Sequence, residues 1–146
     1  MTFALDIRAF ATKAKEASNT VTRQAVGGVI TEVDRRSPVG DPSYWKSPPP
    51  PGYKPGLFRG NWQIGIDREP LSEIGRIDPS GAVATAENLA AIPKEAFGHV
   101  YYLTNNLPYA NRIENGWSRQ APAGVVGLTV IRWEEIVAGA AAAVLV

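Results

Sequence analysis

The stretch FALDIRAFATKAKEASNTVTRQAVGGVITEVDRR, residues 3–36, decides the fold. Its apolar residues recur at alternating spacings of four and three, which places them on one stripe of a helix. The stripe consists of Phe3, Ile7, Phe10, Ala14, Ala17 and Val21. An unbroken helix of this length would extend about 45–50 Å, at about 1.5 Å per residue. A compact domain of this size does not need so long a helix, so we expect part of the stripe to pack against another subunit.

Two features bear on how this helix runs and where it stops. Gly27 and Gly28 weaken it by about 1 kcal/mol each relative to alanine. They mark either a kink or a place where another backbone packs closely. Ser37 precedes Pro38, and a residue before proline disfavours the helical conformation, so the helix should end there.

The next segment, residues 37–60, is a proline-rich loop that holds seven of the twelve prolines. Four of them are consecutive, Pro48 to Pro51, which favours a stiff polyproline II rod. Disordered linkers are poor in aromatic residues, whereas this segment contains Tyr44, Trp45, Tyr53 and Phe58. We therefore expect an arm that carries aromatic side chains to a surface. A ligand for an aromatic-lined groove is the alternative.

The remainder alternates short strands with short helices. Residues 61–67 place Trp62, Ile64 and Ile66 on one face, the period of a half-buried strand. A loop or a second short strand (residues 74–77) follows, and residues 98–105 form the next clear strand. We expect helices at residues 82–91, 108–115 and 127–144. The residues expected to be buried in the first and last of these are Val83, Ala86, Leu89, Ala90, Leu128, Ile131, Ile136 and Val137.

This order of elements predicts a single α+β domain over residues 1–146. Its long N-terminal helix and further helices pack on a small, mostly antiparallel β-sheet, with a long Pro-rich loop. The apolar run at residues 136–146 is only 11 residues long, and a membrane-spanning helix needs about 20. We expect this C-terminal tail (residues 137–146) to bury against protein, with no membrane role.

Composition excludes several functional classes. Hydrophobic residues make up 45% and charged residues 20% of the chain, as in ordinary globular proteins, and the net charge of +1 is too small for a dedicated DNA-binding domain. The absence of cysteine excludes disulfides, thiolate metal sites and cysteine nucleophiles. The chain has no Gly-rich phosphate loop and no metal-ligand spacing, so we expect no cofactor. Asp6 and Arg8 interrupt the apolar stretch that a signal peptide requires.

Three segments carry a resemblance to a known family. They are SPVGDP (residues 37–42) leading to GLFRGNWQ (56–63), then VYYLTNN (100–106), then LPYANRIENGWSRQAP (107–122). In this order after a helix, they resemble the tail-completion or neck proteins (head–tail connector, minor tail) of tailed bacteriophages. The similarity spans residues 1–137. The proline-rich insertion between Gly40 and Gly56 departs from the shortest form of the family pattern.

The resemblance implies a structural virion protein of the neck and no enzyme activity. Such a protein, a tail-completion or tail-terminator protein, forms a homo-oligomeric ring, with six copies expected because tails are six-fold. The ring joins the phage tail tube protein to a portal-side adaptor or stopper protein. DNA passes through it without sequence-specific binding, and viral assembly takes place in the host bacterial cytoplasm.

The candidate interface residues come from the helix, the arm and the motifs. They are Phe3, Phe10, Tyr44, Trp45, Tyr53, Phe58, Arg59, Trp62, Tyr109, Glu114 and Trp117. Tyr109, Ile113 and Trp117 have the helical spacing of four, which favours the core over a subunit contact for the two aromatic residues. The strand opening at Arg59 to Trp62 is either an edge that pairs with a neighbour or an ordinary strand start. Glu114 is either a contact, a cap, or the partner of a nearby arginine.

Two rival functions remain open at this stage. One is a small hydrolase or ligand-binding domain that uses Ser118, His99 and Glu114. The segment around Ser118 resembles a nucleophile elbow but lacks its second glycine, and Glu134 and Glu135 point about 100° apart on a helix, so they form no acid–base pair. The other rival is a proline-rich adaptor module that binds a soluble partner through residues 48–51.

Overall fold

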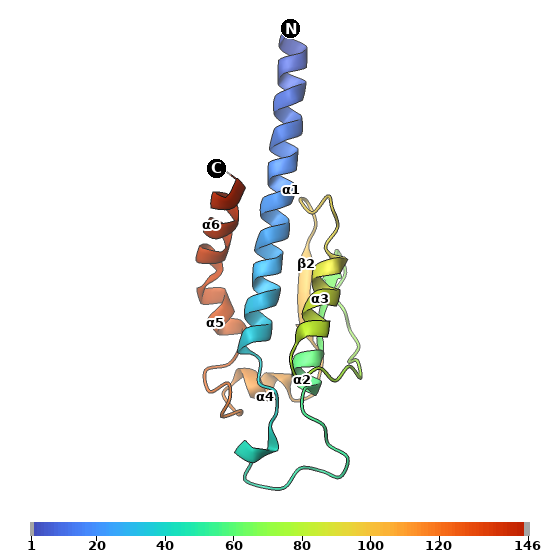
Figure 1. Ribbon diagram of the computed structural model, residues 1–146, viewed down its shortest axis with the longest axis vertical. Coiled ribbons are helices and arrows are strands. Elements are labelled where there is room, and N and C mark those ends of the chain that lie inside the picture. Colours follow the sequence, from blue (N-terminus) through green and yellow to red (C-terminus); the bar gives the residue numbers. More distant parts are fainter. Residues whose placement is uncertain (1, 145–146) are drawn as a thin grey trace.

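The computed structural model describes residues 2–144, with the side chain of Phe3 left out. Helix α1 (Phe3–Arg36) has the predicted bounds and forms the spine of the molecule (Figure 1). It runs through Gly27 and Gly28 without interruption, so the two glycines mark no break. The helix ends where Ser37 turns into extended backbone and donates its N–H to the carbonyl of Asp34, immediately before Pro38.

Two short helices, α5 (Val126–Ile131) and α6 (Trp133–Val144), lie along one side of α1, and α6 runs antiparallel to it (Figure 1). The predicted helix over residues 127–144 is in fact broken at Arg132, into α5 and α6. The backbone leaves the helical conformation at Arg132 (φ −91°, ψ 4°), and Ile131, at the end of α5, is 78% exposed. The expectation that Ile131 is buried was therefore wrong. Of the C-terminal tail, residues 137–144 belong to α6, and residues 145–146 lie outside the described part.

The other side of α1 carries a two-stranded antiparallel sheet and helix α3 (Ala82–Ala91) (Figure 1). Strand β1 (Trp62–Ile66) pairs with β2 (Tyr101–Asn105), from Trp62 opposite Asn105 to Ile66 opposite Tyr101. The possible strand at residues 74–77 is a loop. The buried side chain of Asn61 satisfies the backbone of this loop at Ile74. The Asn61 amide donates to the carbonyl of Ile74 (2.6 Å) and accepts from the N–H of Ile74 (2.9 Å).

Helix α3 (Ala82–Ala91) forms where predicted but presents a different face. Ala84 and Asn88 are buried, whereas the residues predicted to face inward are all exposed, so the predicted face was wrong; they are Val83, Ala86, Leu89 and Ala90. Asn88 explains the rotation. Its amide donates to the carbonyl of Trp62 (2.9 Å) and accepts from the N–H of Ile64 (3.1 Å), so a polar side chain covers the free edge of β1.

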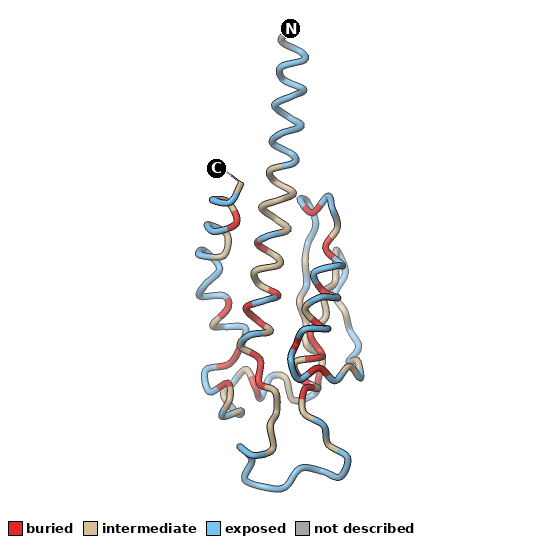
Figure 2. Tube along the Cα trace, viewed as in Figure 1, coloured by how far each residue is buried: buried red, intermediate tan, exposed pale blue. Residues whose placement is uncertain are grey.

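Two connected clusters form the hydrophobic core around the C-terminal half of α1. The larger comprises Val33, Phe58, Trp62, Leu107, Ile113, Ala121 and Val125. The smaller comprises Ile30, Ile92 and Ala96, with Tyr101 and Leu103 of β2 packed on it. Figure 2 shows that buried residues concentrate here and that the N-terminal half of α1 is exposed.

The arm at residues 40–56 extends from the opposite end of the molecule (Figure 1). Of the loop predicted over residues 37–60, residues 37–56 are irregular apart from one 3-10 turn, η1 (Pro42–Tyr44), but residues 57–60 are helical, so the prediction was wrong there. A helical turn, α2 (Leu57–Gly60), follows the arm and leads into β1, and α4 (Ala110–Glu114) lies nearby. Within the described residues, no helix combines the length and the apolar character needed to cross a bilayer.

Candidate functional site: assembly surfaces

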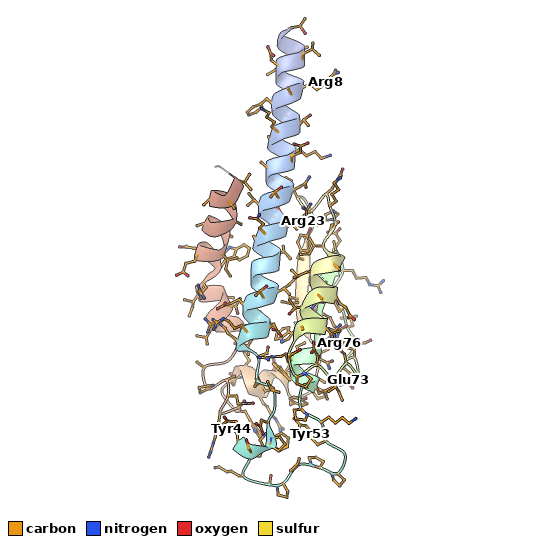
Figure 3. All side chains as sticks on the ribbon, viewed as in Figure 1. Arg8, Arg23, Tyr44, Tyr53, Glu73 and Arg76 are labelled. Carbon is orange, nitrogen blue, oxygen red and sulfur yellow. The ribbon has the colours of Figure 1, made fainter. Side chains whose placement is uncertain are left out.

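The N-terminal half of α1 is an apolar surface that the described chain leaves uncovered. Every residue from 4 to 16 is exposed, and partial burial begins at Ala17, where the helix meets the body. Phe10, Ile7 and Leu5 are 72%, 52% and 50% exposed. Arg8 stands out from this projecting part in Figure 3. The side chain of the candidate residue Phe3 lies outside the described part. An isolated helix of about 12–15 residues is only marginally stable in water, so a partner surface would stabilise this half.

An apolar groove continues the stripe where α1 enters the body. It has a volume of about 290 Å³ and is lined by Ala17, Ser18, Val21, Thr22, Phe97, Ala141 and Val144. The loop that carries Phe97 is hydrogen-bonded to α1. The backbone N–H of Phe97 donates to Asn19 Oδ1 (2.9 Å), and the guanidinium of Arg23 donates to the carbonyl of Lys94 (2.5 Å). The uncovered stripe and this groove therefore form one continuous apolar strip on α1.

The arm is a closed loop with an exposed tip. At its base, the N–H of Gly56 donates to the carbonyl of Val39 (2.8 Å), and the Tyr53 hydroxyl donates to the carbonyl of Gly40 (2.7 Å). The rings of Trp45 and Tyr53 pack with centroids 4.8 Å apart. Tyr44 and Tyr53 are seen in the arm in Figure 3. Tyr44 is 54% and Trp45 is 40% exposed, so the arm presents aromatic side chains as predicted from its composition.

A further exposed aromatic side chain belongs to the segment that follows α4. This segment is joined to the base of the arm, because the N–H of Gly40 donates to Gln120 Oε1 (3.0 Å). Trp117 in the segment is 69% exposed, so the core position favoured for it was wrong. The guanidinium carbon of Arg112 lies 4.8 Å from its ring centroid. An open groove of about 360 Å³ adjoins the ring. Its lining consists of Asn111, Arg112, Asn115, Gly116 and Trp117.

Other candidate residues support the fold instead of presenting a surface. Phe58 and Trp62 are 6% and 7% exposed and pack edge to face at 5.8 Å. Half-buried Tyr109 lies 6.4 Å from Phe58, ring to ring. Arg59 donates to the carbonyls of Pro79 and Ser37, both at 3.0 Å. Phe58, Arg59, Trp62 and Tyr109 thus hold the end of α1 to the start of the sheet, and they offer little area to another subunit.

Glu114 caps helix α5 within the same chain. Its carboxylate accepts the backbone N–H groups of Val125 (2.9 Å), Val126 (2.8 Å) and Gly127 (2.9 Å). Burial tends to raise the pKa of this carboxyl, but the three N–H donors outweigh burial and the pKa is lowered. The sequence suggested a cap as one role for Glu114, but it gave no sign of a helix that begins twelve residues later, at Val126.

The three residues of the rival catalytic hypothesis have separate partners. His99 Nδ1 lies 2.6 Å from Asp67 Oδ2, the Ser118 hydroxyl oxygen accepts the N–H of Gln120 at 3.2 Å, and Glu114 caps α5. The N–H of Val100 and the hydrogen bond with His99 lower the pKa of Asp67. Sequence reasoning missed the His99–Asp67 pair because only the pairing of β1 with β2 brings these residues together. Among the described residues, no cluster of three or more acidic or histidine side chains is placed to hold a metal ion.

A comparison of the chain with protein-family models, curated proteins and solved structures finds no match. The order of the sequence motifs and the surfaces described above are therefore the basis of the functional proposal.

Proposed function

We propose that this chain is a structural protein of the bacteriophage neck, a tail-completion or tail-terminator protein. It forms a ring that joins the tail tube to the capsid connector and lets DNA pass. The ordered motifs of residues 37–63 and 100–122 suggest the family. The observation that carries the proposal is the apolar stripe of α1, where Phe10 is 72% exposed on a helix that projects from the body. Exposed apolar patches of this kind mark protein–protein contacts.

The surfaces suit a subunit that contacts neighbours and stacked partners at once. The part of α1 that carries the stripe lies toward one end of the molecule, and the aromatic arm lies at the other (Figure 1). Copies that stand side by side form a ring when different patches meet head to tail and the rotation closes. The two ends of each copy then face the two sides of the ring, where the tail tube protein and a portal-side adaptor or stopper bind.

The action of such a ring is mechanical. Copies dock on the end of the tail, stop its growth and surround a passage, and no covalent bond is made or broken. A net charge of +1 suits a passage that does not hold DNA tightly, because phosphate contacts by lysine and arginine supply most non-specific affinity for DNA. The number of six copies follows from the family resemblance and the symmetry of tails.

Complementation of a phage that lacks this gene tests the proposal. We expect wild-type protein to restore joined, infectious particles, and the double variant Ile7→Ser, Phe10→Ser to leave heads and tails separate. Val83→Ser is the matched control, because Val83 is a similarly exposed apolar residue (52%) on α3. Joined particles with the double variant, or with no copy of the gene at all, would contradict the proposal.

A further inference from the structure

We infer that the proline run of one copy, Pro48 to Pro51, binds the groove beside Trp117 of a neighbouring copy. This inference rests on the self-assembly contained in the proposed function and names one of the contacts in it. The chain carries both parts of such a contact, an exposed polyproline segment and an exposed aromatic groove with hydrogen-bond donors.

The proline run is exposed and held in an ordered arm, as a binding segment requires. All four prolines are exposed, and they have carbonyl acceptors but no N–H donors. The arm around them is already ordered. The N–H of Tyr53 donates to the carbonyl of Pro50 (3.1 Å) in a turn with Gly52 at φ +77°, and the Tyr53 hydroxyl fixes the base of the arm on Gly40. A preformed segment loses little conformational freedom on binding.

The groove beside Trp117 has the chemistry that recognises such a segment. Proline-rich ligands dock on aromatic side chains, and hydrogen-bond donors fix their carbonyl groups. Trp117 supplies the aromatic surface, with Arg112 held over one face of its ring. The guanidinium of Arg112 and the amide of Asn111 are exposed donors in the lining, whereas the amide of Asn115 donates to the carbonyl of Asn111 (2.7 Å). Donors in the groove and acceptors without donors in the ligand make the two surfaces electrostatically complementary.

The proline run and the groove beside Trp117 are placed so that neighbouring copies in one ring contact each other through them. The hydrogen bond between Gly40 and Gln120 joins the base of the arm to the segment that follows Trp117, so both parts lie at the same end of the molecule. Within one chain, Trp45 pairs with Tyr53 and Trp117 pairs with Arg112, so the two aromatic groups are not stacked on each other. The contact joins two different surfaces, so copies linked head to tail through it close into a ring when the rotation allows.

Disulfide trapping tests the contact directly, because the natural chain has no cysteine. Pro49→Cys and Asn115→Cys proteins are mixed under mild oxidation, and the mixed dimer is identified by mass spectrometry. We expect it to form about tenfold faster than the dimer between Arg8→Cys and Asn115→Cys, and Trp117→Ala in the Asn115→Cys protein to remove about this advantage. Equal rates for the two pairs, or no effect of Trp117→Ala, would overturn the inference.

A labelled peptide of residues 46–54, KSPPPPGYK, provides a second measurement on the full chain. Fluorescence anisotropy should show binding to wild type and to Trp133→Ala, which removes another exposed tryptophan, and binding about tenfold weaker to Trp117→Ala. Lys46 and Lys54 share the sign of Arg112, so binding should not weaken as salt is added. Equal binding of a peptide with alanine in place of the four prolines would overturn the inference.

The outcomes separate the two proposals. If the trapped dimer does not form but the chain occupies the phage neck, the arm contact is wrong and the proposed function stands. If the dimer forms but the chain is absent from phage particles, the contact is real and the proposed function fails.

Discussion

Ile136 of α6 packs directly on Gly28 of α1, where a Cβ atom built on the glycine would lie only 2.7 Å from the isoleucine Cγ2. Gly28 therefore lets α6 approach the spine. We predict that Gly28→Ala destabilises the fold by about 1 kcal/mol. The overpacking cost of about 1–3 kcal/mol exceeds the gain of about 1 kcal/mol in helix propensity. Urea unfolding followed by circular dichroism measures the change.

Two variants control this prediction. Gly139 is also inside a helix, but no atom lies within 4 Å of its virtual Cβ, so Gly139→Ala should stabilise the protein by about 0.5–1 kcal/mol. In an Ile136→Ala background, the obstacle to Gly28→Ala is gone and the substitution should become stabilising. A destabilising effect that persists in that background would show that Ile136 is not the cause.

Glu32 links α1 to the junction between α5 and α6. Its carboxylate accepts hydrogen bonds from Arg35 (2.9 Å), Arg36 (2.7 Å) and Arg132 (3.2 Å). The hydrogen bond from Arg35, aided by that from Arg36 and opposed by burial, lowers the pKa of Glu32 from 4.5 to about 2. A lowered folded-state pKa adds stability that is present above about pH 4.5 and is lost as the pH falls toward about 2.

We therefore predict that Glu32→Gln lowers the free energy of unfolding at pH 7 by about 1–3 kcal/mol. The range extends down to about 1 kcal/mol because solvent screens the exposed arginine partners. The variant should also lose most of the pH dependence of stability between about pH 2 and 4.5. Glu135→Gln is the matched control, because Glu135 also pairs with Arg132 but its side chain is 71% exposed. A wild-type pH profile in Glu32→Gln would refute this role.

Glu114 should matter for stability more than its partial exposure suggests. Glu114→Ala removes the acceptor for three backbone N–H groups at the start of α5, and we expect a loss of about 2 kcal/mol. Glu114→Gln keeps one acceptor oxygen and should lose less. Hydrogen exchange at Val125 and Val126 reports the local effect, which should be absent in Glu134→Gln. Unchanged protection in Glu114→Ala would mean that the cap does not hold α5.

Phe10 and Phe58 test whether the N-terminal half of α1 lacks a partner within the chain. Phe58 is 6% exposed, so Phe58→Ala should destabilise the protein by about 3–5 kcal/mol. Phe10 is 72% exposed, so Phe10→Ala should change the stability of the monomer by less than about 0.5 kcal/mol. Thermal unfolding at low protein concentration measures both. A large loss in Phe10→Ala would place Phe10 against a surface of its own chain.

Local patterns predicted the elements better than the faces they bury. Helix α1 was predicted with its exact bounds, because a long apolar period ends at a Ser-Pro pair, and β1 and β2 were located from their alternating residues. The exposed face of α3 was missed because Asn88 is buried in order to satisfy the backbone of β1. No local pattern reveals a buried asparagine whose partners lie about two dozen residues upstream.

The candidate surfaces were predicted in part for a related reason. The aromatic arm could be recognised from composition alone, whereas its closure by Tyr53 on Gly40 depends on a tertiary contact. The sequence could not show that Trp62 is buried and Trp117 is exposed, since both are tryptophans within motifs that resemble the same family. Their exposures of 7% and 69% are set by whether the neighbouring elements cover them.

The central claim is that this chain works by assembly in the phage neck. A cryo-electron microscopy reconstruction of that neck in purified particles tests it most directly. The account predicts a ring of copies between connector and tail tube, with the apolar stripe of α1 covered by protein. A neck whose density is fully explained by other chains, together with mass spectra of the particles that lack this protein, would contradict the account.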